Sequence, residues 1–180
     1  LSCIPGSVGG SIVMNSGCYG DDISKIFFSL KALNRNGEIE TFNKEQIEFF
    51  YRGNNLNTNL IILSATFKGK IFNKEKILEK QKKLINKKKE SQPTRVKTCG
   101  STFKNPNNKK RAWELIKLSN CSGLKVGGAS ISEKHNNFFL NNGNANSSDI
   151  EKLIYKVKEE VLKKTGTELE LEIKIIGEKK

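Results

Sequence analysis

Arginine and histidine are scarce in this chain. Only four of its 32 basic residues are arginines, and His135 is its one histidine. A zinc site is therefore not expected, and the four cysteines also lack a C-x-x-C spacing. The net charge of +13 would suit an anionic partner. Nucleic-acid binding is nevertheless disfavoured, because no clustered arginine face and no RNP, KH or zinc pattern accompanies the charge.

Lysine supplies the other basic residues and, like asparagine, it is spread over the whole chain. A joint excess of these two residues is typical of an AT-rich genome. We therefore interpret most of the charge as a solvated basic surface. An anionic small molecule would still be attracted by it.

Long apolar runs and a start methionine are also missing. The longest apolar run is Leu60–Leu63, whereas a helix needs about 20 apolar residues to cross a bilayer, so no membrane association is expected. The chain begins at Leu1 without a recognisable signal peptide and enters a glycine-rich motif at once, so we expect further sequence upstream. Unpaired cysteines favour a reducing cytoplasm. These cysteines are Cys3, Cys18, Cys99 and Cys121.

What is present is enough apolar sequence for a packed core. Hydrophobic residues make up 36% of the chain, with ten phenylalanines, which is unlike a disordered protein. Asn34–Gly37 contains an Asn-Gly pair, a strong hairpin signal. Two segments rich in small residues, 4–10 and 15–20, are expected to be loops. Apolar stretches predict three strands, at 26–33, 38–42 and 60–67.

The composition changes after the third strand. Residues 73–91 are rich in lysine and place four apolar side chains near one helical face, which predicts a surface helix or helical linker ending at Gln92-Pro93. We therefore place a domain boundary near residue 70.

The second half mixes helix and strand signals, so the expected fold class is α+β. A short helix is predicted around Ala112–Ile116, after a loop at Pro106–Asn108, and a turn at Gly127-Gly128. Residues 138–140 predict a strand. Ser148–Glu151 matches a capping box, which predicts the start of a helix there, and Gly166 is the predicted C-cap of that helix. The alternation over 169–175 predicts a half-buried strand.

Several motifs are compatible with a ligand site, yet each also has an ordinary structural explanation. The glycines near the start allow backbone to approach phosphate oxygens, or make a tight connection. Ser101 follows a glycine in the segment Gly100–Pro106. Its hydroxyl is either accessible to a ligand or part of an ordinary polar turn. Arg52 is either an ordinary surface arginine or a substrate-binding residue. Glu172 is either on the solvent-exposed face of a strand or in contact with a substrate. His135 is too isolated to support a catalytic triad.

Taken in order, these motifs resemble the UDP-N-acetylenolpyruvoylglucosamine reductase family. The matching blocks are IPGSVGGSIVMNSGCYG, Tyr51-Arg52, GSTFKNP, GGASISEKHNNF and ELELEIKIIGE. Five blocks in the family's order cover the whole chain. The resemblance implies the second half of a two-part FAD-binding domain over 1–70 and an α+β substrate-binding domain over 71–180.

The resemblance also implies a reaction. UDP-N-acetylglucosamine enolpyruvate would be reduced by NADPH through bound FAD, giving the UDP-N-acetylmuramate of peptidoglycan synthesis, in a protein that is monomeric when complete. Ser101 matches the family's proton donor, while Arg52 and Glu172 match the residues that polarise the substrate carboxylate and stabilise the intermediate. Tyr51, Asn105 and Lys174 fall at substrate-binding positions. The flavin-contacting segment supplies Pro5, Gly6, Ser7, Gly9, Gly10 and Asn15.

The sequence departs from the family pattern at three positions and in extent. Asn54 replaces a serine, Leu171 a proline and Lys174 an arginine. The family's N-terminal flavin-binding portion is absent, so we expect this chain to bind FAD weakly by itself. Three alternatives stay open: a truncated inactive copy, a different flavoprotein of the same two-part fold, and a basic nucleic-acid-binding module.

Overall fold

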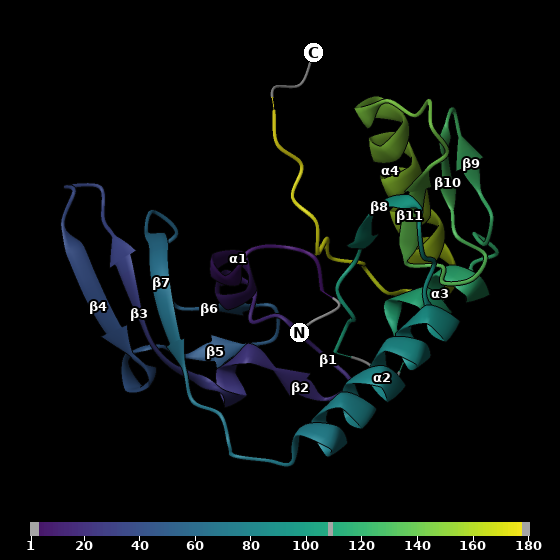
Figure 1. Cartoon of the computed structure of the whole chain (residues 1–180). Coiled ribbons are helices and arrows are strands. Elements are labelled where there is room, and N and C mark those ends of the chain that lie inside the picture. The colour runs from purple at the N-terminus through teal and green to yellow at the C-terminus, as the bar shows by residue number, and fades with distance from the viewer. Residues whose placement is uncertain (1–3, 108–109, 178–180) are drawn as a thin grey trace. The chain divides into compact units, whose positions relative to one another are not determined.

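The chain forms two compact units, Leu1–Glu79 and Lys80–Lys180. The structure is a computed structural model that describes residues 4–107 and 110–177 (Figure 1). Helices and antiparallel sheets occur together, as expected for the α+β class. The division between the units falls within helix α2 (Lys74–Ser91), in which no residue is buried. That the two parts serve flavin and substrate separately stays a prediction.

A three-stranded antiparallel sheet in the order β4-β3-β7 dominates the first unit. Its strands are β3 (Phe27–Leu33), β4 (Ile39–Asn43) and β7 (Ile61–Phe67), which confirms the three strands predicted from the sequence. The Asn34 carboxamide oxygen accepts the N–H groups of Asn36 and Glu38, at 2.9 and 3.0 Å. Gly37 has φ +81°. Together they form the predicted hairpin turn.

The core of the first unit lies on one face of this sheet. It is formed by Ile12, Ile23, Phe27, Leu30, Ala32 and Ile47. The predicted loop over 4–10 is partly wrong, because helix α1 begins at Val8. The Ser7 hydroxyl accepts the Gly10 N–H at 3.1 Å and so caps this helix. The remaining elements are α1 (Val8–Val13), β1 (Gly17–Cys18), β2 (Asp21–Asp22), η1 (Ile23–Lys25), η2 (Lys44–Gln46), β5 (Phe49–Phe50) and β6 (Gly53–Asn54).

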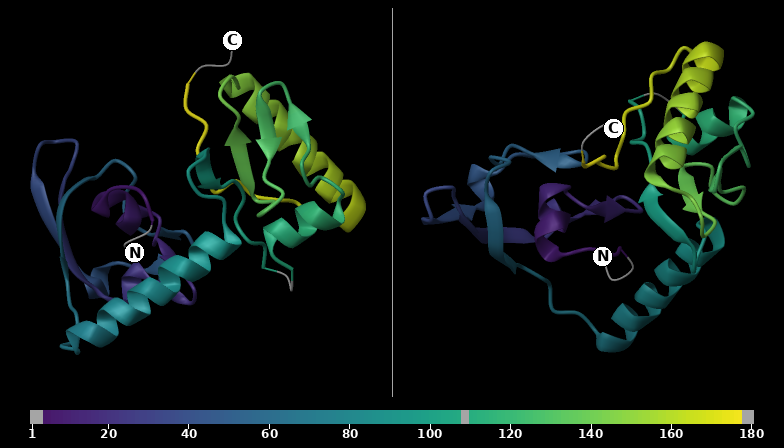
Figure 2. Two further views of the ribbon diagram at one scale, coloured as in Figure 1. Left: turned by 45° about the vertical axis from the view of Figure 1, so that its right-hand side comes forward. Right: turned by 90° about the horizontal axis from the view of Figure 1, so that it is seen from above.

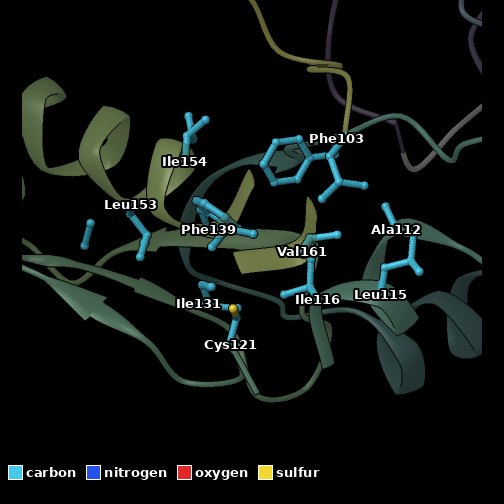
Figure 3. Close-up of a cluster of buried hydrophobic side chains, with 13 residues drawn as sticks. Phe103, Ala112, Leu115, Ile116, Cys121, Ile131, Phe139, Leu153, Ile154 and Val161 are labelled. Atoms are coloured by element: carbon cyan, nitrogen blue, oxygen red, sulfur yellow. The ribbon is translucent and has the colours of Figure 1, made fainter. Parts of the chain in front are cut away.

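The second unit packs one long helix against a four-stranded antiparallel sheet in the order β8-β11-β10-β9, and a short helix packs against the long one (Figure 2). The strands are β8 (Lys97–Ser101), β9 (Lys125–Val126), β10 (Ala129–Ile131) and β11 (Phe138–Asn141), and the helices are α3 (Ala112–Leu118) and α4 (Ser147–Thr165). Apolar side chains from both helices and the sheet meet in one core (Figure 3). Its largest members are two phenylalanines, Phe103 and Phe139, followed by the leucines and isoleucines Leu115, Ile116, Ile131, Leu153, Ile154 and Leu169. The predicted short helix, the glycine turn and the strand at 138–140 are confirmed.

The ends of α4 show what its sequence pattern could and could not place. The predicted capping box at Ser148 is wrong by two residues, because Asn146 is the N-cap. Its carboxamide oxygen accepts the Asp149 N–H at 2.8 Å, and Asp149 accepts the Asn146 N–H in return. Asparagine caps a helix as well as serine does, so the sequence offers several neighbouring residues that could each be the N-cap. Gly166 ends the helix with φ +68°, as predicted.

The strand predicted over 169–175 is wrong. Leu171 pairs with Phe103 in a single antiparallel bridge, and no strand is formed around it. The partner segment is too short to extend the pairing. Gly100 has φ +84° at one end of it, and Pro106 has no N–H to offer at the other. The predicted alternation of buried and exposed side chains is still seen at its start, where Leu169 is buried and Glu170 is exposed.

Two predictions reach residues outside the described ranges, the loop at Asn108 and the thiol of Cys3. Cys18 and Cys99 are unpaired and exposed, and Cys121 is unpaired and buried. Among the described residues no helix is both long and apolar enough to cross a membrane. The same ranges contain no group of three or more His, Cys, Asp or Glu side chains that could hold a metal ion.

Candidate functional site

Ser101 lies at the end of β8, directly after an irregularity in the sheet. Its partner on β11 is Phe138, whereas the next pair along is Thr98 with Leu140, so β8 carries one extra residue between the pairs. Gly100 occupies this bulge with φ +84°. A bulge of this kind re-aims the following side chain. Ser101 is half-buried, as a hydroxyl that meets a ligand would be.

Backbone pairing sets the Glu172 segment beside the residues that follow Ser101. The Glu172 N–H donates to the Thr102 carbonyl at 2.9 Å, and the Lys104 N–H donates to the Glu170 carbonyl at 2.8 Å. The Lys104 ammonium also forms an ion pair with the Glu170 carboxylate. Glu172 is half-buried. The structure therefore brings two of the predicted catalytic residues, Ser101 and Glu172, onto adjacent segments of one unit.

Asn105 and Lys174 also lie in this unit. The Asn105 carboxamide oxygen accepts the N–H of Ala112, the first residue of α3, at 3.1 Å. Part of its hydrogen-bonding capacity thus anchors a helix. Lys174 is exposed, two residues after Glu172. Leu171, where the family pattern has proline, packs against the core of the unit.

Tyr51 and Arg52 form the tip of the β5–β6 hairpin in the first unit. Arg52 has φ +58°, a conformation that costs a non-glycine residue about 1–2 kcal/mol. Its guanidinium lies 4.8 Å from the centroid of the Tyr51 ring and donates to the Gly17 carbonyl at 3.4 Å. A Cβ at Gly53 would come within 2.2 Å of the Phe50 ring, so any other residue there would displace this ring. Strain of this kind is concentrated at functional sites.

The side chain of Asn15 is engaged inside the first unit. It is 4% exposed, donates to the Phe50 carbonyl at 3.0 Å and accepts the Ser24 N–H at 3.2 Å. The residue predicted to contact the flavin therefore also fixes the strand that leads to Tyr51. Asn54, the departure from the family's serine, donates to the carbonyls of Ile12 and Val13 and so closes the end of α1.

The other predicted flavin-contacting residues form the start of α1 and the turn before it. Pro5, Gly6 and Ser7 are exposed, and Gly6 has φ +136° with open space where a Cβ would be. Gly9 packs against β7, since a Cβ there would meet Ile62 at 3.4 Å. The segment thus offers exposed backbone on one side and a rigid support on the other.

His135 is placed in an aromatic environment in the second unit. Its ring centroid lies 4.8 Å from that of Phe138 and 6.2 Å from that of Trp113. Its Nδ1 is buried without a hydrogen-bond partner among the described residues. Burial lowers the pKa of His135, and the positive charge of Arg111 lowers this pKa further. The base of a catalytic triad is oriented by a carboxylate on its second ring nitrogen, and His135 has no such partner on Nδ1 among the described residues.

Comparison with known proteins finds one family for the second unit and for nearly the whole chain. Residues 92–176, which lie within the second unit, match the family described as UDP-N-acetylenolpyruvoylglucosamine reductase, C-terminal domain. Proteins named UDP-N-acetylenolpyruvoylglucosamine reductase match nearly the whole chain. The one from Wolbachia sp. subsp. Drosophila simulans (strain wRi) is 50% identical over 97% of the chain, and the one from Pelagibacter ubique (strain HTCC1062) is 47% identical over 98%. The chain belongs to the UDP-N-acetylenolpyruvoylglucosamine reductase family.

A solved structure extends this agreement to the fold. The UDP-N-acetylenolpyruvylglucosamine reductase from Thermus caldophilus superimposes with a TM-score of 0.85 at 32% identity over 96% of the chain, which covers 61% of that structure. The chain likewise spans 59% of the length of the Wolbachia and Pelagibacter reductases. The α+β fold of this reductase family is therefore shown for this chain.

Proposed function

We propose that this chain carries the substrate-reducing residues of a UDP-N-acetylenolpyruvoylglucosamine reductase. The reaction would reduce UDP-N-acetylglucosamine enolpyruvate to UDP-N-acetylmuramate with NADPH and FAD, as a step in peptidoglycan precursor synthesis. The observation that supports it best is the pairing of the Ser101 and Glu172 segments in a chain 50% identical to such a reductase. Because the chain spans 59% of that relative, the activity of the whole protein is part of the proposal.

The residues before and within α1 fit one flank of a flavin nucleotide. Pro5, Gly6 and Ser7 are exposed, and Gly9 and Gly10 have no side chain to keep a ligand away from the backbone. We assign these five residues to FAD contacts, with Asn15 holding the adjoining strand. When bound, FAD would supply the hydride chemistry.

Ser101 is the proposed proton donor. Hydride addition at the methylene carbon leaves carbanion character on the carbon that bears the carboxylate, and that carbon must gain a proton. The Oγ–H of Ser101 is a weak acid in water, so it suits only a strongly basic acceptor of this kind. The donated proton and the hydride together complete the reduction of the double bond. General acid catalysis of this type contributes about 10²–10⁴-fold.

Arg52 is the proposed partner of the substrate carboxylate. A guanidinium stays charged throughout and holds a carboxylate through two parallel N–H bonds. Its strained backbone and its contact with Tyr51 fix the direction from which the fork approaches. Preorganised charge of this kind stabilises the negative charge that grows as the double bond is reduced. Tyr51, Asn105 and Lys174 would add contacts to the rest of the substrate.

Glu172 is the proposed stabiliser of the enol-like intermediate. Two carboxylates that lie close together resist double ionisation. A role for Glu172 beside the substrate carboxylate therefore requires that one of the two groups hold a proton. The neighbouring Glu170 differs from Glu172, because its carboxylate forms an ion pair with Lys104.

The two half-reactions separate these roles. In the full-length protein, purified with FAD, we expect Ser101→Ala to leave flavin reduction by NADPH near normal, because no proton goes to a substrate carbon in that step. Reoxidation of the flavin by the enolpyruvyl substrate should slow by about 10²–10⁴-fold. Rapid-mixing absorbance follows each half-reaction separately.

Ser101→Cys is the matched variant, because a thiol can still donate a proton, and it should keep more activity than Ser101→Ala. Equal slowing of both half-reactions by Ser101→Ala would show that the serine is structural. A full-length protein that never retains flavin, or whose reduced flavin is not reoxidised by the substrate, would instead identify an inactive copy and defeat the proposed function.

A further inference from the structure

We propose that Asn137 is a positioning residue that fixes Ser101 and Glu172 relative to one another. The proposal rests on the proposed function, since it concerns the same proton-transfer site. Asn137 lies directly before β11, in the SEKHNNF block, and its side chain faces the segment that joins Ser101 to Asn105.

The Asn137 carboxamide makes the two hydrogen bonds to Phe103 that a residue of a neighbouring strand would otherwise make. Its oxygen accepts the Phe103 N–H at 2.9 Å, and its amide nitrogen donates to the Phe103 carbonyl at 2.7 Å. The Asn137 backbone carbonyl also accepts the Thr102 N–H at 2.8 Å. Three hydrogen bonds from one residue therefore hold the two residues that follow Ser101.

The Glu172 segment binds the opposite edge of the same backbone. The Thr102 carbonyl accepts the Glu172 N–H, and Lys104 donates to the Glu170 carbonyl. In this antiparallel bridge Phe103 turns its own N–H and carbonyl toward Asn137. The segment over 102–104 is thus held between Asn137 on one edge and the Glu172 segment on the other. Loss of the Asn137 bonds would let this backbone shift and so change the position of Ser101 relative to Glu172.

Burial makes these bonds hard to replace. Asn137 is 3% exposed and Phe103 is 1% exposed, so the Phe103 backbone groups cannot turn to water if the carboxamide is lost. A carboxamide supplies a donor and an acceptor on one flat group, which matches a single backbone residue. Leucine has a similar shape but neither group.

The neighbouring Asn136 provides a matched control. It is also 3% exposed, and its amide donates to the Ser122 hydroxyl at 2.6 Å. In the described part of the chain its side-chain hydrogen bond leads to Ser122 and not to the 101–104 segment. Substitution of either asparagine removes a buried hydrogen-bonding group, but only Asn137 acts on Ser101 and Glu172.

The test compares Asn137→Leu with Asn136→Leu in the full-length, FAD-containing protein. We expect Asn137→Leu to slow substrate-driven flavin reoxidation by about 10²-fold through misplacement of the donor, with flavin reduction by NADPH within about threefold of wild type. Asn136→Leu should leave both steps within about threefold of wild type. In the Ser101→Ala background, Asn137→Leu should cost less than about threefold more, because the two residues act as a unit.

Each outcome decides the matter. Equal effects of the two leucine variants, or costs that multiply in the double variant, would show that Asn137 only stabilises the fold and would overturn the proposal. Should Asn137→Leu fail to fold, Asn137→Asp takes its place. A protonated carboxyl offers a donor and an acceptor, so its activity relative to wild type should recover as the pH falls, and a flat ratio would contradict the proposal. A wild-type protein without substrate-driven reoxidation would remove the proposed function itself, before any variant is compared.

Discussion

His135 shows how one buried side chain couples stability to pH. Burial and Arg111 lower its pKa in the folded protein, so the unfolded chain binds the proton more tightly. The stabilising contribution is therefore complete above the unfolded pKa of about 6.5 and is lost as the pH falls through the folded value. We expect the free energy of unfolding to fall between pH 7 and pH 5, as measured by urea titration at each pH.

His135→Phe tests this coupling, because phenylalanine keeps an aromatic ring between Trp113 and Phe138 but cannot be protonated. The loss of stability toward pH 5 should be smaller in this variant than in wild type. The other titrating groups are common to both proteins, so the difference between the two pH profiles isolates the histidine. Identical profiles would mean that His135 does not titrate in this range.

At the scale of the element, the bulge in β8 links a backbone conformation to the direction of a side chain. Gly100 has φ +84° and Gly37 has φ +81°, and a Cβ would meet nothing within 4 Å at either position. Alanine at either position should therefore cost about 1–2 kcal/mol of stability through the left-handed backbone alone. Only Gly100 precedes Ser101, so only Gly100→Ala should also slow substrate-driven flavin reoxidation.

This comparison needs chemical denaturation for the stability of both variants and rapid-mixing absorbance for their half-reactions. The Gly37→Ala variant serves as the control for lost stability, because its turn lies in the other unit. If both variants slow the reaction equally, the bulge has no special role in aiming the Ser101 hydroxyl.

At the scale of the whole molecule, the connection between the two units is the most accessible part of the described chain. Residues 68–73 are exposed and form neither helix nor strand, and α2 buries none of its residues. We expect limited trypsin digestion to cut first within 70–95 and to release two protected fragments, identified by mass spectrometry.

Lysines in α4 provide an internal control for this digestion. Lys152, Lys156 and Lys163 offer trypsin similar bonds, but the helix that carries them buries Leu153 and Val157 in the core. Cleavage there requires local unfolding of the second unit. A first cut inside 150–165 would therefore contradict the division of the chain into these two units.

The sequence by itself determined the elements whose signals are local. The Asn-Gly pair and its flanking strands specify the β3–β4 hairpin, because turn geometry and alternation act over a few residues. The apolar period of α4 and its terminal Gly166 likewise act within one helix. The five motif blocks also identified the family from the sequence, because their order along the chain can be recognised without knowing which residues are in contact.

Only the tertiary structure decided how the site is held. The alternation over 169–175 predicted a strand, yet Gly100 and Pro106 on the partner segment limit the pairing to one bridge. Asn137 looked like one polar residue among several, but it lies 34 positions from Phe103 and meets it through two hydrogen bonds. Such bonds join a side chain to a distant backbone group, and no periodicity in the sequence records them.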